Sequence, residues 1–198
     1  MTPAAADLAA LAERIRACAR CGGLVGSRPV PGAGPPGARL FFLAEAPGRF
    51  GAARTGVPLS GDRSGDLFDA MLRAHGLCRA SVYVSNVVHC NPLDGGGRNR
   101  APRAGELAAC DGHWRAELAL VRPRLLVTLG AISCLRATGR RLATARARLV
   151  PGPGVPVFAL YHPAYVVRGG CNRSEYGRDW AALCRALEQL EGRGASPR

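Results

Sequence analysis

Four short apolar segments recur along this chain of 198 residues, and segments with a helical spacing of apolar residues lie between them. Short apolar runs bounded by turn residues are typical of strands buried on both faces. Strands that alternate with helices form a parallel sheet between two helical layers. We therefore predict an α/β fold of three layers, α/β/α, with a central four-stranded parallel sheet. The strands are expected at residues 39–44, 81–88, 124–129 and 156–160.

No internal repeat or shift in composition divides the chain, so we expect one domain over residues 1–198. Its first part, 1–37, is expected to contain a helix, a Cys-x-x-Cys pair and a loop rich in glycine and proline. Residues 191–198 are expected to form a flexible tail. Apolar residues three and four positions apart predict helices at 5–19, 66–75, 104–120, 131–137 and 175–190.

The chain is strongly basic. It has 27 basic residues, all of them arginine, against 14 acidic ones, and its formal net charge is +13. Such an excess favours a polyanionic partner, of which nucleic acid is the commonest, while a basic surface without a partner is the alternative. No apolar run reaches the ~18 residues that would span a bilayer, and the first residues lack the pattern of a signal peptide. We therefore expect a cytoplasmic protein without membrane contacts.

Four of the eight cysteines are spaced like metal ligands. A reducing compartment disfavours a disulfide framework, which leaves metal ligands, catalytic thiols or buried small side chains. Cys18 and Cys21 form a Cys-x-x-Cys pair, Cys90 follows the second strand, and Cys110 lies in the next helix. Spacing alone does not separate a zinc ion from an iron–sulfur cluster, because four thiolates can hold either.

Distinctive polar residues lie where the predicted strands end, which is where parallel sheets bind their ligands. The first strand leads into Ala-Glu-Ala-Pro-Gly at 44–48, which contains Glu45. Asn86 lies near the end of the second strand. The last strand is followed by His162, Pro163 and Ala164, with Arg168 four residues further on.

These motifs resemble the uracil-DNA glycosylase superfamily, specifically its iron–sulfur family 4, and the first loop is also similar to family 5. The resemblance runs from Cys18 to about residue 190. Residues 44–48 match the family 4 motif Gly-Glu-x-Pro-Gly with Ala44 in place of the leading glycine. Residues 162–168 match His-Pro-[Ser/Ala]-x-x-x-Arg without a gap.

Base chemistry suggests roles for the three polar residues. A base must leave the duplex before its glycosidic bond can be reached, and its Watson–Crick edge is then read. The amide of Asn86 can donate to O4 of uracil and accept from N3–H. His162, with backbone N–H groups of the first loop, can stabilise negative charge at O2 of the departing base. Glu45 can orient or deprotonate the attacking water. The alternatives are an Asn that caps a turn, a structural His and a solvated loop carboxylate.

The resemblance implies further site residues and one departure from the family. Family 4 carries a Phe that stacks on the uracil, and this chain has Leu59 in the matching segment, so either Phe50 replaces that ring or the pocket is looser. Ala46 completes the predicted base-binding set, at a position where many relatives carry Asp. Family 5 accepts a wider set of deaminated bases. Predicted DNA contacts are Arg54, Arg63, Arg100, Tyr165, Val166 and Arg168, with Tyr165 and Val166 filling the gap left by the flipped nucleotide.

The resemblance also assigns a [4Fe–4S] cluster to Cys18, Cys21, Cys90 and Cys110, with zinc as the alternative. The implied activity is hydrolysis of the N-glycosidic bond of uracil in DNA by a monofunctional glycosylase. A glycosylase for hypoxanthine, xanthine or a modified base, and an inactive DNA-binding member of the fold, are the alternatives. We expect a monomer that acts on damaged DNA in a bacterial or archaeal nucleoid.

Overall fold

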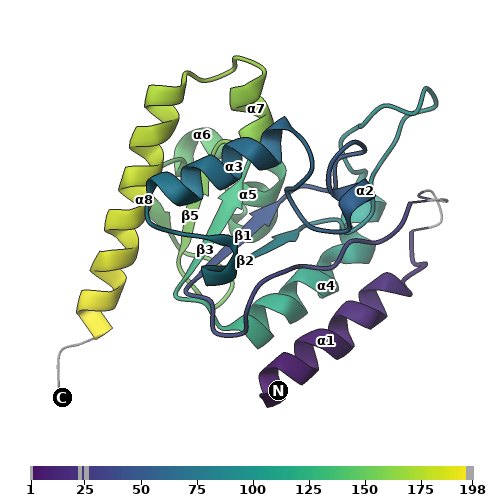
Figure 1. The fold of residues 1–198 in the computed structure, drawn as a ribbon, viewed down its shortest axis with the longest axis horizontal. Coiled ribbons are helices and arrows are strands. Elements are labelled where there is room, and N and C mark those ends of the chain that lie inside the picture. Colours follow the sequence, from purple (N-terminus) through teal and green to yellow (C-terminus); the bar gives the residue numbers. More distant parts are fainter. Residues whose placement is uncertain (1, 22–23, 25–26, 195–198) are drawn as a thin grey trace.

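A computed structural model describes residues 2–21, 24 and 27–194, and shows a central sheet between helical layers (Figure 1). The strand order is β2-β1-β3-β5-β4, and the first four of these strands run parallel. The α/β prediction is confirmed, with one correction: the sheet has a fifth strand, β4, which pairs antiparallel with β5. The sequence did not indicate β4 because it is only two residues long. The strands are β1 (Leu40–Ala44), β2 (Val82–Asn86), β3 (Leu125–Leu129), β4 (Leu149–Val150) and β5 (Val157–Leu160).

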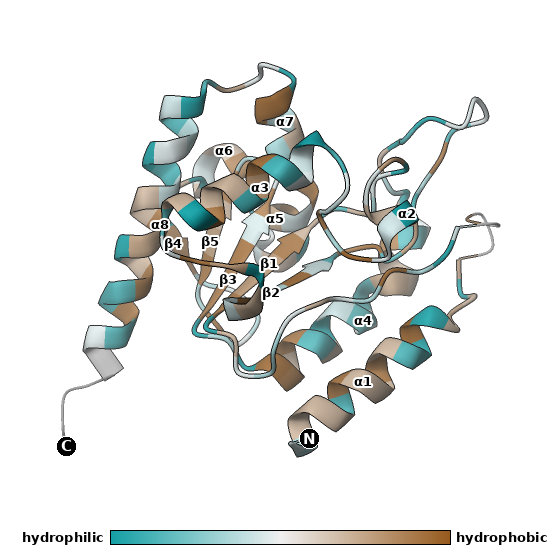
Figure 2. Cartoon of the chain, in the orientation of Figure 1, coloured by the Kyte–Doolittle hydropathy of each residue, from teal (hydrophilic) through white to brown (hydrophobic). Residues whose placement is uncertain are grey.

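Each face of the sheet carries its own apolar core, as expected for strands buried on both sides. On one face Phe42 of β1 packs against Phe68 and Trp180, with ring centroids 5.1 and 5.5 Å apart. On the other face Phe41 stacks on Tyr83 at 5.0 Å. Helices α3, α7 and α8 cover the first face, and α4, α5 and α6 cover the second. The strands are accordingly apolar, while the helices alternate apolar and polar residues (Figure 2).

The helices begin where polar side chains satisfy free backbone N–H groups. Asp62 caps α3, and His162 caps α7 with Pro163 as its first residue. The long predicted helices are present within a few residues, but the short α2, α6 and α7 were not predicted. The helices are α1 (Pro3–Arg16), α2 (Ala52–Thr55), α3 (Arg63–Ala74), α4 (Ala104–Val121), α5 (Ala131–Thr138), α6 (Leu142–Ala145), α7 (Pro163–Val167) and α8 (Arg173–Gly194), with a 3-10 turn η1 (Arg79–Ser81).

The expected flexible tail is partly wrong, because α8 continues to Gly194; residues 195–198 lie outside the described residues, as do 22–23 and 25–26 of the predicted N-terminal loop. Among the helices that the structure describes, none is both long and apolar enough to cross a membrane.

Parallel pairing brings the predicted site segments to one edge of the sheet. Ala44 lies beside Asn86, and Leu129 lies beside Leu160, so the carboxyl ends of all four parallel strands are level. Gly130, at the end of β3, has a φ of +99°, and a Cβ there would lie 3.2 Å from Cβ of His162. Glycine at 130 therefore allows the β5–α7 loop to pack closely on the end of β3.

Candidate active site and cysteine cavity

A cavity of about 470 Å³ opens at the carboxyl edge of the sheet. It is formed by the loop after β1, the loop after β2 and the start of α7. The structure thus brings together side chains that are more than 100 positions apart in sequence, Glu45 and His162 among them. The sequence-predicted residues that line it are Glu45, Ala46, Leu59, Arg100, His162 and Arg168.

The imidazole of His162 is held as a neutral hydrogen-bond donor. Its Nδ1 accepts a hydrogen bond from the backbone N–H of Ala164 at 3.1 Å, so that nitrogen carries no proton. Burial, with the charge of Arg168, lowers the pKa of His162 to about 4, against a smaller opposing effect of Asp62. At neutral pH the ring proton is therefore on Nε2, which is free to donate to a ligand in the cavity.

Glu45 follows β1 directly and is partly buried in the cavity wall. Its backbone carbonyl accepts from the N–H of Val88 at 3.0 Å, which fixes the loop after β1 to the loop after β2. Burial raises the pKa of Glu45, and the positive charge of Arg168 opposes that rise. A carboxylate in this setting has the raised basicity that suits a general base.

Asn86 is the last residue of β2 and is 1% exposed. It is not among the residues that line the cavity, but its register partner Ala44 immediately precedes Glu45. Its Nδ2 finds no hydrogen-bond partner among the described residues. Buried polar groups are rarely left unpaired in native proteins, and an unpaired one is often explained by a functional role.

Leu59 forms an apolar part of the cavity in a backbone conformation that leucine rarely adopts. It is 8% exposed and has a φ of +50°. The guanidinium of Arg79 holds the loop there: it donates to the carbonyls of Pro58, at 2.7 Å, and Leu59. Arg79 is itself fixed by an ion pair with Asp69 at 2.7 Å. Residues far from the loop therefore position the side chain of Leu59.

Two residues predicted to contact the base or the DNA do not line the cavity. Phe50 does not line the cavity; it is 61% exposed and its ring is covered by Arg49, whose guanidinium lies 4.3 Å from the ring centroid. Val166 does not project outward, because it is 6% exposed and belongs to the core under α7. A short helix that packs on the sheet must bury one of its two adjacent residues, and here Tyr165, 41% exposed, is the outer one.

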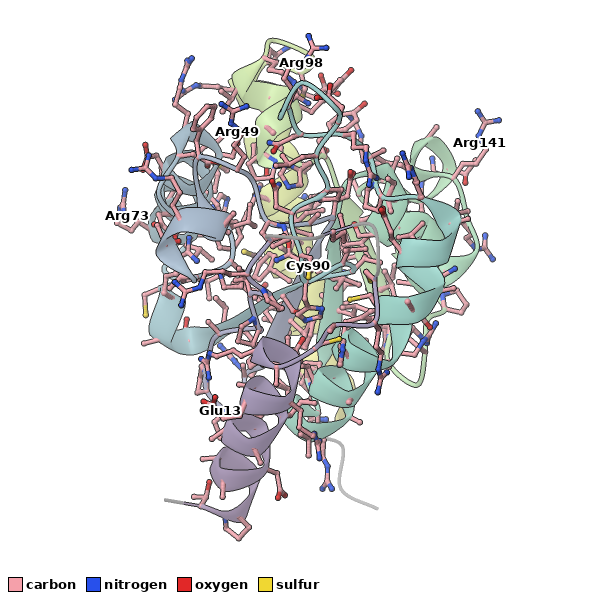
Figure 3. All side chains as sticks on the ribbon, turned by 90° about the vertical axis from the view of Figure 1, so that its right-hand side faces the viewer. Glu13, Arg49, Arg73, Cys90, Arg98 and Arg141 are labelled. Carbon is pink, nitrogen blue, oxygen red and sulfur yellow. The ribbon has the colours of Figure 1, made fainter. Side chains whose placement is uncertain are left out.

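The predicted arginines differ in whether their charge is exposed to solvent or paired with a carboxylate of the protein. Arg54, Arg63 and Arg168 are exposed. Arg100, by contrast, makes two hydrogen bonds to the Glu106 carboxylate, at 2.8 and 2.5 Å, so its charge is balanced within the protein. Figure 3 shows Arg49 and Arg98 at one end of the molecule, with Arg98 directed outward.

Sequence analysis missed four polar residues of the cavity: Asp62, Ser64, Asn91 and Asn99. Oδ1 of Asp62 accepts from the N–H groups of Ser64 and Gly65 at 3.0 and 2.9 Å, while Oδ2 faces the loop after β1. The side chain of Asn91 bonds to Asn99 and to the carbonyl of Pro47. The helix-capping signal at Asp62 was readable in the sequence, but its approach to the first loop depends on tertiary packing.

A second cavity, of about 290 Å³, is lined by all four predicted metal ligands: Cys18, Cys21, Cys90 and Cys110. Burial, followed by the nearby sulfurs of Cys110, Cys21 and Cys18, raises the pKa of Cys90 to about 12. The same causes raise the pKa of Cys21. Thiols that raise one another's pKa in this way need a positively charged group between them to become thiolates together.

Four thiols that line one cavity could hold either a zinc ion or an iron–sulfur cluster. Within residues 2–21, 24 and 27–194, no three His, Cys, Asp or Glu side chains lie close enough together to hold one ion. A zinc site would require four sulfurs about 2.3 Å from one centre. A [4Fe–4S] cluster would instead be held by one thiolate at each of its four irons.

The fold and the first cavity define an α/β enzyme that combines a buried carboxylate with a neutral imidazole donor. Comparison with known sequences gives the family: the pattern described as Uracil DNA glycosylase superfamily matches residues 31–184. The chain belongs to the uracil-DNA glycosylase superfamily, and the resemblance seen in its motifs is confirmed.

Curated relatives carry the names of two types within that superfamily. A type-4 uracil-DNA glycosylase of Thermotoga maritima is 32% identical over 82% of this chain and 84% of its own length. A type-4 enzyme of Pyrobaculum aerophilum is 31% identical over 88% and 92%. A type-5 uracil-DNA glycosylase of the same organism is 32% identical over 77% and 80%. This chain is therefore similar to both types, as its first loop suggested.

Proposed function

We propose that this protein hydrolyses the N-glycosidic bond of uracil in DNA and leaves an abasic site. The observation that carries the proposal is the meeting of Glu45 and His162 in one cavity, with the imidazole neutral and its Nε2–H free. The names of the type-4 and type-5 relatives support uracil as the base. The substrate is then uracil-containing DNA in the cytoplasm.

His162 acts on the departing base. Cleavage of the glycosidic bond leaves negative charge on the pyrimidine, much of it at O2. A neutral N–H donor fixed in advance stabilises that charge without having to reorganise. Nδ1 is tied to Ala164, so the ring keeps both its tautomer and its orientation during the reaction.

Glu45 acts on water and on the sugar. Its carboxylate accepts a proton from the attacking water as the new C–O bond forms at the anomeric carbon, and its negative charge stabilises the positive charge developing on the sugar. The cation of Arg168 lies close enough to both Glu45 and His162 to shift their pKa values. Arg168 therefore keeps the carboxylate ionised and the imidazole neutral.

Asn86 reads the base. Its unpartnered Nδ2 donates to O4 of uracil, and its Oδ1 accepts from N3–H; cytosine offers the opposite pattern at these two positions. Leu59 supplies an apolar face for the ring. An aliphatic side chain stacks less selectively than an aromatic one, so a glycosylase that also removes hypoxanthine or xanthine is a second candidate, favoured by Leu59 and the type-5 relatives.

The DNA backbone is bound by the exposed arginines. Arg54, Arg63 and Arg168 lie around the loops of the cavity, and Tyr165 projects beside them to fill the space left by the flipped nucleotide. The net charge of +13 makes a steep decrease of affinity with salt the expected behaviour.

Cys18, Cys21, Cys90 and Cys110 hold a [4Fe–4S] cluster in this proposal. When bound, the cluster supplies a structural crosslink and no chemistry to base removal. It joins the segment after α1 to the loop after β2 and to α4. These segments lie beside the loop that carries Glu45, because Ala46 packs against the same small apolar cluster as Cys90.

The test is incubation of the purified protein with a uracil-containing oligonucleotide, followed by alkali to cleave abasic sites. Strand scission that disappears in His162→Ala supports the proposal. Oligonucleotides with hypoxanthine or xanthine, run in parallel, decide the breadth of substrates. DNA binding without scission on any of the three substrates would overturn the enzyme assignment in favour of a binding protein.

A further inference from the structure

A fully buried polar network lies directly behind the cysteine cavity, and base excision does not use it. Its members, Ser85, His89 and Glu117, are at most 1% exposed. Burying a carboxylate and an imidazole costs free energy unless each finds partners. The network therefore has a purpose that its contacts should reveal.

One side of the network faces a cysteine sulfur. The backbone N–H of His89 points at Sγ of Cys110 at 3.3 Å, and Nδ1 of the same residue lies 3.4 Å from that sulfur. Two nitrogens of one residue thus converge on one sulfur. Cys90, the next residue along, is half-buried and is labelled near the middle of the view in Figure 3.

The other side of the network holds the imidazole in place. Nε2 of His89 lies 3.3 Å from Oε2 of Glu117 and 3.3 Å from the hydroxyl of Ser85. The hydroxyl donates to the Glu117 carboxylate, so both groups present acceptors to Nε2. Oε1 of Glu117 accepts from the backbone N–H of Gly32 at 2.7 Å. Nε2 faces these acceptors with one proton and Nδ1 faces the sulfur with a second, so the ring donates at both nitrogens as an imidazolium paired with the Glu117 carboxylate.

A second histidine meets the cavity from α4. Nε2 of His113 lies 3.3 Å from Sγ of Cys18, and its ring packs edge-on against His89 with centroids 5.6 Å apart. Two of the four cysteines therefore have an imidazole nitrogen within hydrogen-bond distance.

We propose that His89, anchored by Glu117, and His113 are positioning residues that donate N–H···S hydrogen bonds to the cluster ligands Cys110 and Cys18 and set the reduction potential of the cluster. The inference rests on the cluster assigned under the proposed function. Donors to thiolate sulfur stabilise the more negative, reduced cluster, so they raise its potential. The larger effect belongs to His89, which is buried and backed by a carboxylate.

The experiment compares midpoint potentials of the cluster-loaded protein by spectroelectrochemical titration. The double variants His89→Leu/Glu117→Gln and His89→Asn/Glu117→Gln both remove the buried carboxylate, but only the second keeps an N–H near the position of Nδ1. We expect the first to shift to a more negative potential and the second to remain nearer the wild type. His113→Phe should give a smaller negative shift. His75→Asn, whose ring bonds to Met71 and stacks on Trp180, should give none.

Equal potentials in the two loaded double variants would overturn the inference. A second measurement covers variants that fail to assemble a cluster: pulsed paramagnetic resonance of the reduced wild-type protein labelled with ¹⁵N-histidine. Nitrogen couplings from histidine support the inference, and their absence overturns it. Wild-type protein with zinc or without iron overturns both the cluster and this inference, whereas an iron-loaded protein inactive on uracil contradicts the proposed activity alone.

Discussion

The base cavity, lined by Glu45 and His162 among others, and the cysteine cavity, lined by Cys18, Cys21, Cys90 and Cys110, share a wall. They differ in whether their buried polar groups have hydrogen-bond partners. Ala46 lines the first cavity and packs against the apolar cluster that contains Cys90 and Cys110 in the second. Beside the first, at the end of β2, the amide of Asn86 has a buried donor without a partner among the described residues. In the second, His89 meets a sulfur at one ring nitrogen and a carboxylate at the other.

This difference separates a site for a transient ligand from a site for a permanent one. A buried donor without a partner costs about 1–3 kcal/mol, which is tolerable where a substrate supplies the missing bond during each turnover. A network whose members are satisfied in the absence of substrate suits a group that stays bound. The comparison makes opposite predictions for substitutions on the two sides of the shared wall.

The largest effect is expected at the cysteine cavity. Cys110→Ala should abolish iron binding and most of the soluble yield, because Cys110 is buried and contacts His89 as well as the proposed cluster. Iron per chain and the visible absorbance of the purified protein measure the effect. Cys184→Ala, which removes a half-buried thiol from α8, is the matched control and should keep both. A coloured, iron-loaded Cys110→Ala protein would show that another residue is the ligand.

Glu45 should give the next largest effect. Glu45→Gln should reduce kcat by about 10³-fold, within the usual range for a general base, and leave the affinity for abasic product DNA unchanged. Because burial raises the pKa of Glu45, wild-type activity should fall as the pH falls through a value above the usual range of glutamate.

This loss of activity at low pH, the acidic limb of the pH profile, does not come from protonation of His162. Its pKa is lowered to about 4, so its ring remains a neutral donor while Glu45 takes up a proton. The residual activity of Glu45→Gln should therefore be flat across the same pH range. An unchanged acidic limb in the variant would assign the titration to another group and remove Glu45 from the role of base.

Much of the fold and of the candidate site was predictable from sequence, and the residues that were misplaced have a common physical cause. The ends of parallel strands must meet at one edge, so strand prediction alone placed Glu45 near His162. Whether a side chain at a loop or on a short helix faces the core depends on tertiary packing. Phe50 and Val166 were misplaced for that reason: each lies in a segment too short for periodicity to assign a buried face.

The network of the cysteine cavity was hidden from sequence for a different reason. Glu117 and His89 are 28 positions apart, and isolated charged residues on a helix are usually solvated. The apolar segments gave no indication that α4 would bury a carboxylate against β2. Only the packed structure shows that Glu117 has a backbone N–H, a hydroxyl and an imidazole around it.

A substitution of Asn86 should change both the stability of the protein and its selectivity between bases. Asn86→Leu removes the unpaired donor while keeping the branched arrangement of side-chain heavy atoms, and should stabilise the free protein by about 1 kcal/mol. It should also lower the preference for uracil over cytosine by at least ~10²-fold, since recognition of the base edge is lost. Denaturant unfolding and excision assays on both bases measure the two effects.

Thr128→Val is the matched control for that stability gain. Thr128 in β3 is also fully buried, and its Oγ1 lacks a partner within the described part of the chain. The substitution should stabilise the protein to a similar extent and leave base preference unchanged. If Asn86→Leu instead destabilises the protein as a substitution of His89 would, the amide is a structural group and the contrast between the two cavities fails.

The smallest effect is expected at Arg79, which acts on the base cavity only through Leu59. Arg79→Gln removes the cation that holds the carbonyls of Pro58 and Leu59, and the loop can then relax from its left-handed conformation. KM for uracil-containing DNA should rise a few-fold with kcat nearly constant, because a misplaced apolar face weakens base binding and leaves Glu45 and His162 in place.

Loss of a positive charge could raise KM without any change in the loop, so the control must remove an exposed positive charge from a position outside the loop. Arg73→Gln does so: Arg73 lies on α3, is exposed and projects outward (Figure 3). An effect carried by the loop appears in Arg79→Gln alone and persists at high salt, where phosphate contacts are weak. Equal effects of both variants, both reduced by salt, would mean that Arg79 acts on DNA and that Leu59 is held by its own packing.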